Sequence, residues 1–450
     1  MPAPESAPEI CPIICVAPGA LPDSLSDGQR AWAKANGFDG QRGRLLPLPA
    51  EQGDLGAFLF GVGATEGRPG FVTGLAAAAL QPGRYRLEGE LGDPLLAALG
   101  FRLGAYRFDR YLTPRDPVEL VPADDIDLAE LDRLTSAAVL ARDLVNTPAN
   151  DLGPEALHAR VTQFAAENGM QLTATVGDDL RDGFPMIHAV GRAAAEAPRL
   201  LDLRWGDPSA PKITLVGKGV TFDTGGLDIK TAAGMLLMKK DMGGAANTLG
   251  LAQAIVSAGL KVNLRVLLPV VENAISAPSF RPGDVLRARD GTTVEIGNTD
   301  AEGRLILADA LCLADEESPE LIVDMATLTG AARAALGPEL PPLYTADEAV
   351  ADGLLAAGLR LEDPLWRMPL HAPYISMLKS RIADINNAGS GVGAGSITAA
   401  LFLKRFVKQA RAWAHLDIYA WAPEARAGRS AGGTDQGIRA VYAYLKQHYS

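Results

Sequence analysis

The chain has 450 residues, and its 48% hydrophobic and 21% charged residues are close to the values of ordinary globular proteins. This composition excludes wholesale disorder and, at roughly 100–200 residues per domain, predicts two or three domains. The net charge of −12 argues against a nucleic-acid-binding or anionic-membrane-binding surface as the main function.

Cysteine usage and the lack of long apolar stretches both bear on the compartment. The 3 cysteines show no CxxC spacing and leave one unpaired, which favours a reducing environment. No apolar stretch approaches the roughly 20 residues that a membrane helix requires, and no secretory leader is visible. We therefore expect a cytoplasmic protein without a membrane partner.

In chain order, residues 1–125 are rich in Gly and Pro turns with short apolar pieces, and they predict a small N-terminal α/β domain. Residues 126–160 predict a linking helix and a hinge. Asp127, followed three residues later by Glu130, is typical of a capping box at the start of that helix. The helix must end before Pro148, because proline disfavours a helical conformation in the residue before it.

Residues 161–450 predict a larger catalytic domain in which apolar runs alternate with helical patterns. The runs that suit buried strands are residues 213–216, 266–271, 321–325 and 414–418. Such alternation over a long stretch predicts an α/β fold whose mainly parallel central sheet is covered by helices on both faces.

Ligands of open α/β sheets bind beyond the carboxyl ends of the strands, so the residues that follow the apolar runs are candidates. Asp223, Asp241, Asp300 and Glu302 lie in such segments. Taken singly, each has an ordinary interpretation, such as a turn cap or an exposed salt bridge. Gathered in one crevice, they would repel each other strongly unless cations neutralised them, and carboxylates in this number suit two divalent ions. The histidines lack metal-ligand spacing, and His415 is interpreted as a core residue.

Residues 298–305 read NTDAEGRL, an octapeptide that resembles the signature of the leucyl aminopeptidase (cytosol aminopeptidase) family. The resemblance extends over roughly residues 135–420, with further matches in the same order at residues 142–148, 216–219, 221–223, 281–284, 326–331, 397–403 and 413–418. It implies a metal-dependent exopeptidase that removes the N-terminal residue, leucine or another apolar residue, from peptides.

The resemblance also implies the ligands of the metal site. Two divalent ions, Mn²⁺ or Zn²⁺, are expected to bind to Lys218, Asp223, Asp241, Asp300 and Glu302, with Asp223 and Glu302 contacting both. A water bridging two such ions has a lowered pKa and is expected to attack the peptide as hydroxide.

Other residues are assigned catalytic and pocket roles by the same resemblance. Lys230 is expected to polarise the scissile carbonyl, and Arg304 is expected to hold a bicarbonate that serves as general base. The side-chain pocket is expected to be lined by Met238, Thr327, Leu328 and Gly330, although Met238 is interpreted equally well as a core residue.

The chain departs from the family pattern near the expected site. Thr231-Ala232-Ala233 follows Lys230 where the family usually has Pro or Ser-Glu, and residues 419–423 and 432–437 also differ. These segments leave the metal chemistry untouched, but they put the preference for leucine in doubt.

Two other functions and one assembly state are left open. A two-metal hydrolase of another bond, such as a phosphoester, would need more cationic clamps than Lys230 and Arg304. A non-catalytic assembly protein on the same fold would be favoured by lost ligands, but every ligand position is filled. The family forms homohexamers, so one is expected here. The low charge of residues 326–336 and 397–403 is consistent with an interface or with ordinary core elements.

Overall fold

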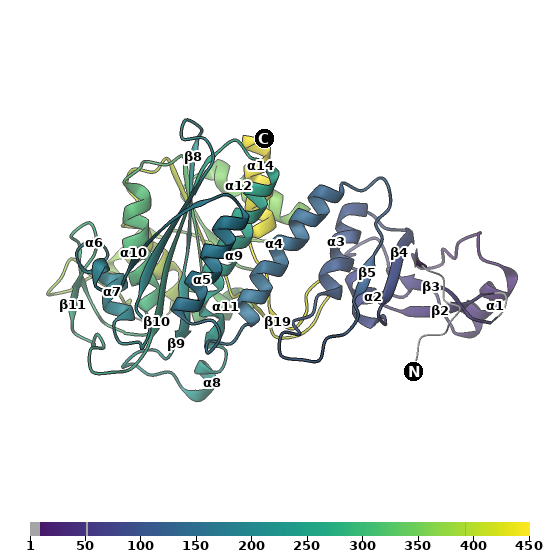
Figure 1. The fold of residues 1–450 in the computed structure, drawn as a ribbon, viewed down its shortest axis with the longest axis horizontal. Helices are drawn as coiled ribbons and strands as arrows, with labels where there is room; N and C mark the ends of the chain where they lie inside the picture. Colours follow the sequence, from purple (N-terminus) through teal and green to yellow (C-terminus); the bar gives the residue numbers. More distant parts are fainter. Residues whose placement is uncertain (1–9, 51–52, 392) are drawn as a thin grey trace. The chain divides into compact units, whose positions relative to one another are not determined.

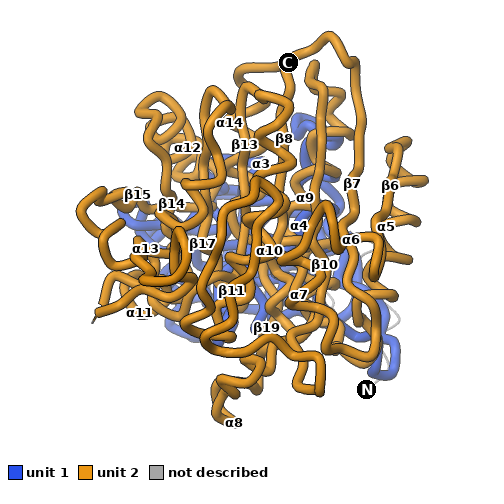
Figure 2. The backbone as a smooth tube through the Cα atoms, turned by 90° about the vertical axis from the view of Figure 1, so that its left-hand side faces the viewer, with its two compact units in different colours: residues 1–139, 422–431 blue, residues 140–421, 432–450 orange. Residues whose placement is uncertain are grey.

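The computed structural model describes residues 10–50, 53–391 and 393–450, and the chain divides into two compact units. Unit 1 consists of residues 1–139 and 422–431, and unit 2 of residues 140–421 and 432–450, as the colours of Figure 2 show. The domain limits at residues 125 and 160 stay a prediction. The sequence did not predict that residues 422–431 would belong to unit 1.

Unit 1 is built around a sheet that has five strands within the described residues, in the order β2-β3-β1-β4-β5. β1 lies parallel to both β3 and β4 and buries Ile13 against Phe60 and Phe101. The elements of this unit are β1 (Cys11–Val16), α1 (Asp27–Ala35), β2 (Leu45–Pro49), β3 (Leu55–Gly61), α2 (Gly74–Ala79), β4 (Gly83–Gly89), α3 (Pro94–Ala105) and β5 (Val118–Leu120). The small α/β fold predicted for the N-terminal part is confirmed.

The predicted linking helix is α4 (Leu128–Asn146), which is followed by α5 (Pro154–Glu167). Asp127 caps α4, since its carboxylate accepts a hydrogen bond from the backbone N–H of Glu130 at 3.0 Å. The helix ends two residues before Pro148, as proline geometry requires. Both the start and the end of this helix were therefore predictable from local sequence.

Unit 2 contains a sheet of nine strands within the described part of the chain, in the order β15-β14-β17-β13-β8-β10-β7-β6, with β9 pairing beside β10. Its strands are β6 (Gln171–Val176), β7 (Arg199–Trp205), β8 (Lys212–Gly217), β9 (Gly219–Asp223), β10 (Asn263–Asn273), β13 (Leu321–Ala326), β14 (Pro342–Tyr344), β15 (Trp366–Arg367) and β17 (Ala412–Asp417). The central strands β17, β13, β8 and β10 are parallel, whereas β7 and β6 continue one edge antiparallel. All residues of β13 and β17 are buried, as expected for strands covered on both faces.

Helices cover both faces of this sheet, with α7 and α10 on one side and α5 and α9 on the other (Figure 1). The remaining helical elements of unit 2 are η1 (Gly177–Asp179), α6 (Leu180–Gly183), α7 (Pro185–Gly191), α8 (Ala232–Met235), η2 (Met238–Met242), α9 (Gly243–Ala258), α10 (Glu302–Asp315), α11 (Gly330–Leu336), α12 (Glu348–Arg360), η3 (Ala372–Leu378), α13 (Gly395–Lys404) and α14 (Ile438–Tyr449). Among the described helices, none combines the length and the apolar character needed to span a membrane. The predicted mainly parallel, two-sided α/β fold is confirmed.

Two short sheets complete the fold, one with β11 (Val285–Arg287), β12 (Thr293–Glu295) and β16 (Ile385–Asn386), the other with β18 (Trp421–Ala422) and β19 (Gly432–Gly433). β12 pairs in parallel with β16. Parallel pairing sends both chains out of this sheet in the same direction, so the loop after β12 and the segment after β16 emerge together. The first of these is the loop that carries the predicted octapeptide.

Candidate metal centre

The candidate ligands come from the carboxyl ends of β8 and β9, from η2 and from the beginning of α10. Lys218 connects β8 to β9, and Asp223 is the last residue of β9. Glu302 is the first residue of α10, and Asp300 lies in the loop just before it. Asp241 comes from η2, which leads into α9. Residues more than 80 positions apart in sequence thus meet at one edge of the sheet.

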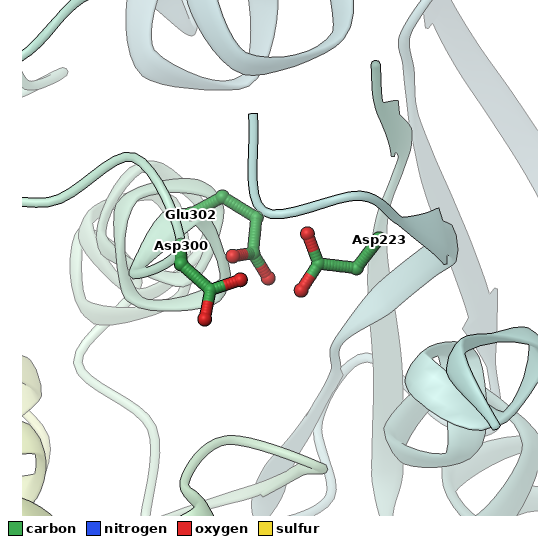
Figure 3. A group of neighbouring side chains, drawn as sticks. All are labelled: Asp223, Asp300 and Glu302. Atoms are coloured by element: carbon green, nitrogen blue, oxygen red, sulfur yellow. The ribbon is translucent and has the colours of Figure 1, made fainter. Parts of the chain in front are cut away.

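Three of the four predicted carboxylates converge closely. Asp223, Asp300 and Glu302 each offer one oxygen, and these oxygens all lie within 4.8 Å of one another. Figure 3 shows the three carboxylates directed towards a shared space, Asp223 from its strand and the other two from the beginning of α10. Asp223 and Glu302 are buried, and Asp300 is partly exposed.

Two lysines hold this cluster together in the protein alone. Lys218 Nζ lies 2.7 Å from Asp241 Oδ2 and 3.0 Å from Glu302 Oε1, and it donates to the carbonyl oxygen of Thr327 at 3.0 Å. Lys230 Nζ lies 2.8 Å from Asp223 Oδ2 and also pairs with Asp300. Asp241 is therefore tied to the other carboxylates through Lys218.

Gly303 leaves room for the Lys218 side chain at the beginning of α10. A Cβ on Gly303 would lie 2.5 Å from Lys218 Cε, closer than real side chains approach. The Asp-x-Glu-Gly pattern of the octapeptide therefore has a physical reason: the two carboxylates are followed by a residue that leaves room for the lysine. Any larger residue would push Lys218 away from Glu302.

The excess of carboxylates over lysines makes the cluster favourable for binding a cation and unfavourable for binding an anion. Burial raises the pKa of Glu302 to about 8, and the neighbouring Asp223 carboxylate contributes. Burial likewise raises the pKa of Asp223 to about 6, with a further contribution from Asp241. Burial lowers the pKa of Lys218, but the carboxylates of Asp241 and Glu302 more than reverse this, so its pKa is raised. Even with Glu302 mainly protonated near neutral pH, the other three carboxylates face two lysines, which leaves negative charge uncompensated.

One buried oxygen lacks a partner. Glu302 Oε2 is shielded from water and accepts no hydrogen bond from the described residues. A buried carboxylate oxygen in this state is costly, and a coordinated cation would satisfy it. Hard oxygen donors at this spacing suit divalent ions such as Mn²⁺ or Mg²⁺ and also accept Zn²⁺. The residues present therefore fit a divalent metal site.

Asp223 is oriented by its own loop and by β10. Its Oδ1 accepts hydrogen bonds from the backbone N–H of Gly225 and from Asn273 Nδ2, both at 2.8 Å. Gly225 has a φ of +89°, a left-handed conformation that glycine adopts without strain. These bonds leave Oδ2 directed to Lys230 and the shared space.

Asn387, which follows β16, braces the octapeptide loop and was missed by the sequence reasoning. Its Oδ1 accepts from the N–H groups of Gly297 and Asn298 at 2.8 and 3.2 Å, and its Nδ2 donates to the carbonyl of Asn298 at 2.7 Å. Its own carbonyl accepts from Arg304 Nη1 at 2.6 Å. Its sequence context gives no local signal, since only the parallel pairing of β12 with β16 brings it here.

Every residue assigned a site role from the sequence borders one cavity of about 670 Å³. These residues are Lys218, Asp223, Lys230, Met238, Asp241, Asp300, Glu302, Arg304, Thr327, Leu328 and Gly330. The structure brings all of them together, and their roles as metal ligands, catalytic groups and pocket residues stay predictions. Met238 is half-buried and lines the cavity wall.

The loop after β13 is fixed to β17. Asp417 Oδ1 accepts from the N–H groups of Leu328 and Thr329, both at 3.1 Å, and its Oδ2 accepts from Thr329 Oγ1 at 2.6 Å. Thr327 Oγ1 donates to the Asp241 carboxylate at 2.9 Å. The predicted pocket loop is thus anchored both to the sheet and to the carboxylate cluster.

Among the lining residues without a predicted role are two cationic side chains and a tyrosine, namely Lys240, Arg333 and Tyr419. Lys240 Nζ lies 4.5 Å from the centre of the Tyr419 ring, and the Arg333 guanidinium lies 5.2 Å from it. Burial lowers the pKa of Lys240 to about 8. The sequence offered two signals: Lys240 directly precedes Asp241, and Tyr419 opens a segment that departs from the family pattern.

Two remaining predictions concern His415 and Arg304. His415 is fully buried with its Nδ1 2.5 Å from Asp324 Oδ1, which confirms it as a core residue. Arg304 is buried beside Asn387, and burial lowers its pKa to about 10, while the Glu302 carboxylate opposes this shift. Arg304 is therefore cationic near neutral pH and lines the cavity.

The fold and the site together define a metal-dependent hydrolase: a crevice at the carboxyl ends of parallel strands, with clustered carboxylates and lysines around a cavity. The comparisons with known proteins specify the class further. The catalytic domain of the cytosol aminopeptidase family matches residues 139–442, and the N-terminal domain of M17 aminopeptidases matches residues 12–121. The chain belongs to the cytosol aminopeptidase family and is an M17 metallo-exopeptidase.

Individual relatives support this assignment over most of the chain. A probable cytosol aminopeptidase of Syntrophotalea carbinolica is 42% identical over 385 residues, which cover 80% of this chain and 77% of the relative. The crystal structure of the cytosol aminopeptidase from Coxiella burnetii is 46% identical, with a TM-score of 0.93 and coverage of 98% of both chains. The bottromycin maturation enzyme BotP in complex with Mn is 35% identical, with a TM-score of 0.89 and coverage of 98% and 99%.

Proposed function

We propose that this metal-dependent aminopeptidase holds two divalent ions on Lys218, Asp223, Asp241, Asp300 and Glu302 and releases the N-terminal residue of peptides. The convergence of three carboxylate oxygens within 4.8 Å, next to a buried carboxylate oxygen without a partner, carries the proposal. A lysine amine ligates a metal only when deprotonated, and an adjacent dication favours that form.

When bound, two divalent ions lower the pKa of a shared water, so that hydroxide is available as the nucleophile near neutral pH. Lys230 is proposed to act on the carbonyl group that the hydroxide attacks. Cations on Asp223 and Asp300 would compete with Lys230 for these carboxylates, which frees its ammonium to donate to the scissile carbonyl oxygen and to stabilise the charge that develops there.

Arg304 is proposed to hold the anion that accepts the proton of the attacking water. It borders the cavity, and Asn387 O fixes one of its nitrogens at 2.6 Å. The remaining guanidinium donors suit a planar anion such as bicarbonate. No carboxylate or histidine is needed as general base in this arrangement.

The N-terminal side chain is proposed to enter between Met238 and the loop Thr327–Gly330. Met238 and Leu328 give this part of the cavity an apolar wall, which supports leucine or another apolar residue at the N-terminus of the substrate. A Cβ on Gly330 would meet no atom within 4 Å, so space remains open beside it.

The homohexamer and the cytoplasmic location stay predictions. Leu401, Phe402 and Leu403 of the apolar segment 397–403 lie in the core of the single chain, so this segment lends no support to an interface. The hexamer therefore depends on the resemblance to the family, and light scattering of the purified protein would check it.

A panel of aminoacyl p-nitroanilides and short peptides tests the proposed function. Release of the free N-terminal amino acid should stop after chelation and return on addition of Mn²⁺ or Zn²⁺. A p-nitrophenyl phosphate control separates this activity from phosphoester hydrolysis. Hydrolysis that survives complete metal removal, or that is confined to the phosphoester, would overturn the proposal.

A further inference from the structure

Lys240 is a buried lysine that forms no close ion pair with a carboxylate of the described residues. Lys240 belongs to η2 and is 5% exposed, yet its ammonium has no ion pair and no hydrogen bond with the described residues. The neighbouring lysines of the site differ from it, because Lys218 and Lys230 each contact two carboxylates. Lys240 nevertheless borders the same cavity.

The nearby carboxylates are engaged elsewhere. Asp417 accepts four hydrogen bonds, from the N–H groups of Leu328 and Thr329 and from the hydroxyls of Thr329 and Ser396. The Asp241 carboxylate contacts Lys218 and Thr327. Asp417 therefore holds the loop after β13, and Asp241 belongs to the carboxylate cluster. Neither forms a close ion pair with Lys240.

Tyr419 and Arg333 extend the positive wall. The Tyr419 ring lies close to both the ammonium of Lys240 and the guanidinium of Arg333, and its hydroxyl accepts a hydrogen bond from Arg333 Nη1 at 3.0 Å. Cation–π contact stabilises such an arrangement only in part, since a ring face supplies less than a carboxylate would. Burying a charge without an ionic partner is costly, so a site of this kind is completed by an anion from outside.

The position of Lys240 and Arg333 beside the predicted side-chain pocket indicates which kind of ligand they would contact. Arg333 belongs to α11, which begins at Gly330, the last residue of the predicted pocket loop, and Lys240 is two residues from Met238. The cationic wall thus adjoins the part of the cavity in which Met238 and Leu328 form an apolar surface. A ligand with an aliphatic stem and a terminal carboxylate matches both features.

We propose that Lys240, supported by Tyr419 and Arg333, forms an anion subsite that binds a carboxylate of the peptide substrate. This inference rests on the proposed aminopeptidase function and adds the class of substrate: peptides that present a carboxylate at this wall. The carboxylate comes either from the side chain of an N-terminal glutamate or aspartate or from the free C-terminus of a short peptide.

Isosteric substrate pairs test the subsite and separate the two sources. Glutamyl and glutaminyl p-nitroanilide differ in the side-chain carboxylate, and Leu-Gly and Leu-Gly amide differ in the C-terminal one. The kcat/KM ratio within each pair is measured for wild type, Lys240→Met and Lys240→Arg with metal added. Lys239→Met is the matched control, because Lys239 lies on the same element but donates to Asn146 O at 2.6 Å and does not line the cavity.

One pair should favour its charged member in wild type, and Lys240→Met should reduce that ratio by about tenfold to a hundredfold, as expected for loss of a charge-assisted hydrogen bond. Lys240→Arg and Lys239→Met should retain the ratio. A fall for the glutamyl pair assigns the side chain, and a fall for the dipeptide pair assigns the C-terminus. Should Lys240→Met fail to fold, Arg333→Met, an exposed position, gives the same readout.

Two results would count against the inference, and they are distinguishable. Efficient hydrolysis with both ratios unchanged in Lys240→Met overturns the anion subsite and leaves the aminopeptidase intact. No hydrolysis of any of the four substrates by metal-loaded wild type overturns the proposed function, and the subsite with it.

Discussion

Replacing Asn387 with alanine tests how the octapeptide loop is held in place. Asn387 is fully buried, and its amide pairs with both the N–H and the C=O of Asn298 and with the N–H of Gly297. The loop between Asn298 and α10 carries Asp300 and Glu302, so a shift here moves two of the proposed metal ligands. Asn387 is therefore a positioning residue, which acts through the loop.

The magnitude follows from the bonds that are lost. Gly297 is exposed, so water replaces the bond to its amide at little cost. The loss is concentrated on Asn298, whose two backbone groups each lose a partner, and we expect a destabilisation of about 1–3 kcal/mol. Displacement of reacting groups by roughly 1 Å costs about a hundredfold in rate, so kcat should fall by about that factor.

The assay combines kcat, KM, metal content and thermal unfolding. Asn387→Ala should lower kcat and metal affinity while the variant stays folded, and raising the metal concentration should restore occupancy but only part of kcat. Asn386→Ala is the control, since Asn386 Oδ1 accepts a hydrogen bond from Ala388 N within its own segment. A fully loaded Asn387→Ala with kcat within about threefold of wild type would refute the positioning role.

Two further substitutions probe the cluster and the general base. Glu302→Gln should abolish turnover and lower the metal content measured by mass spectrometry, because it removes the charge of a proposed metal ligand. Burial raises the pKa of Glu302 from 4.5 to about 8, so its ionisation costs stability in the metal-free protein. The unfolding free energy of metal-free wild type should therefore fall as pH rises through this interval, and less so in Glu302→Gln; equal pH profiles would contradict the assignment. Arg304→Ala should lose about 10²–10⁴-fold in rate and keep both metals, with bicarbonate stimulating wild type more than the variant; equal stimulation would remove Arg304 from that role.

Much of the fold was predictable because its signals are local. Asp127 and Pro148 mark the limits of α4 through capping and proline geometry, and these effects need only neighbouring residues. The apolar run Leu321–Met325 became β13, which is buried along its whole length. The antiparallel edge formed by β7 and β6 was not predicted, because pairing direction depends on which strands meet across the sheet.

In the candidate site, too, some features could be predicted from the sequence and others could not. The convergence of Asp223, Asp300 and Glu302 was predictable because the loops that follow strands of an α/β fold gather near one another, and their roles as metal ligands stay a prediction. Asn387 was not predictable, because it reaches the octapeptide loop only through the register that pairs Glu295 with Asn386. Tyr419 lies in a segment that departs from the family pattern, but its contacts with Lys240 and Arg333 join three separate parts of the chain.

Charge balance explains why the lysines of this site have different tasks. Lys218 and Lys230 each contact two carboxylates of the cluster, so their charges are balanced within the protein. Lys240 is one residue from Asp241 but has no ion pair among the described residues, so metal binding leaves its charge still to be balanced. Divalent ions add positive charge to the cavity and strengthen its attraction for an anion. Bound ions and the cationic wall would therefore both favour an anionic ligand. The more completely the ions neutralise the carboxylate cluster, the more strongly the proposed subsite should attract a substrate carboxylate.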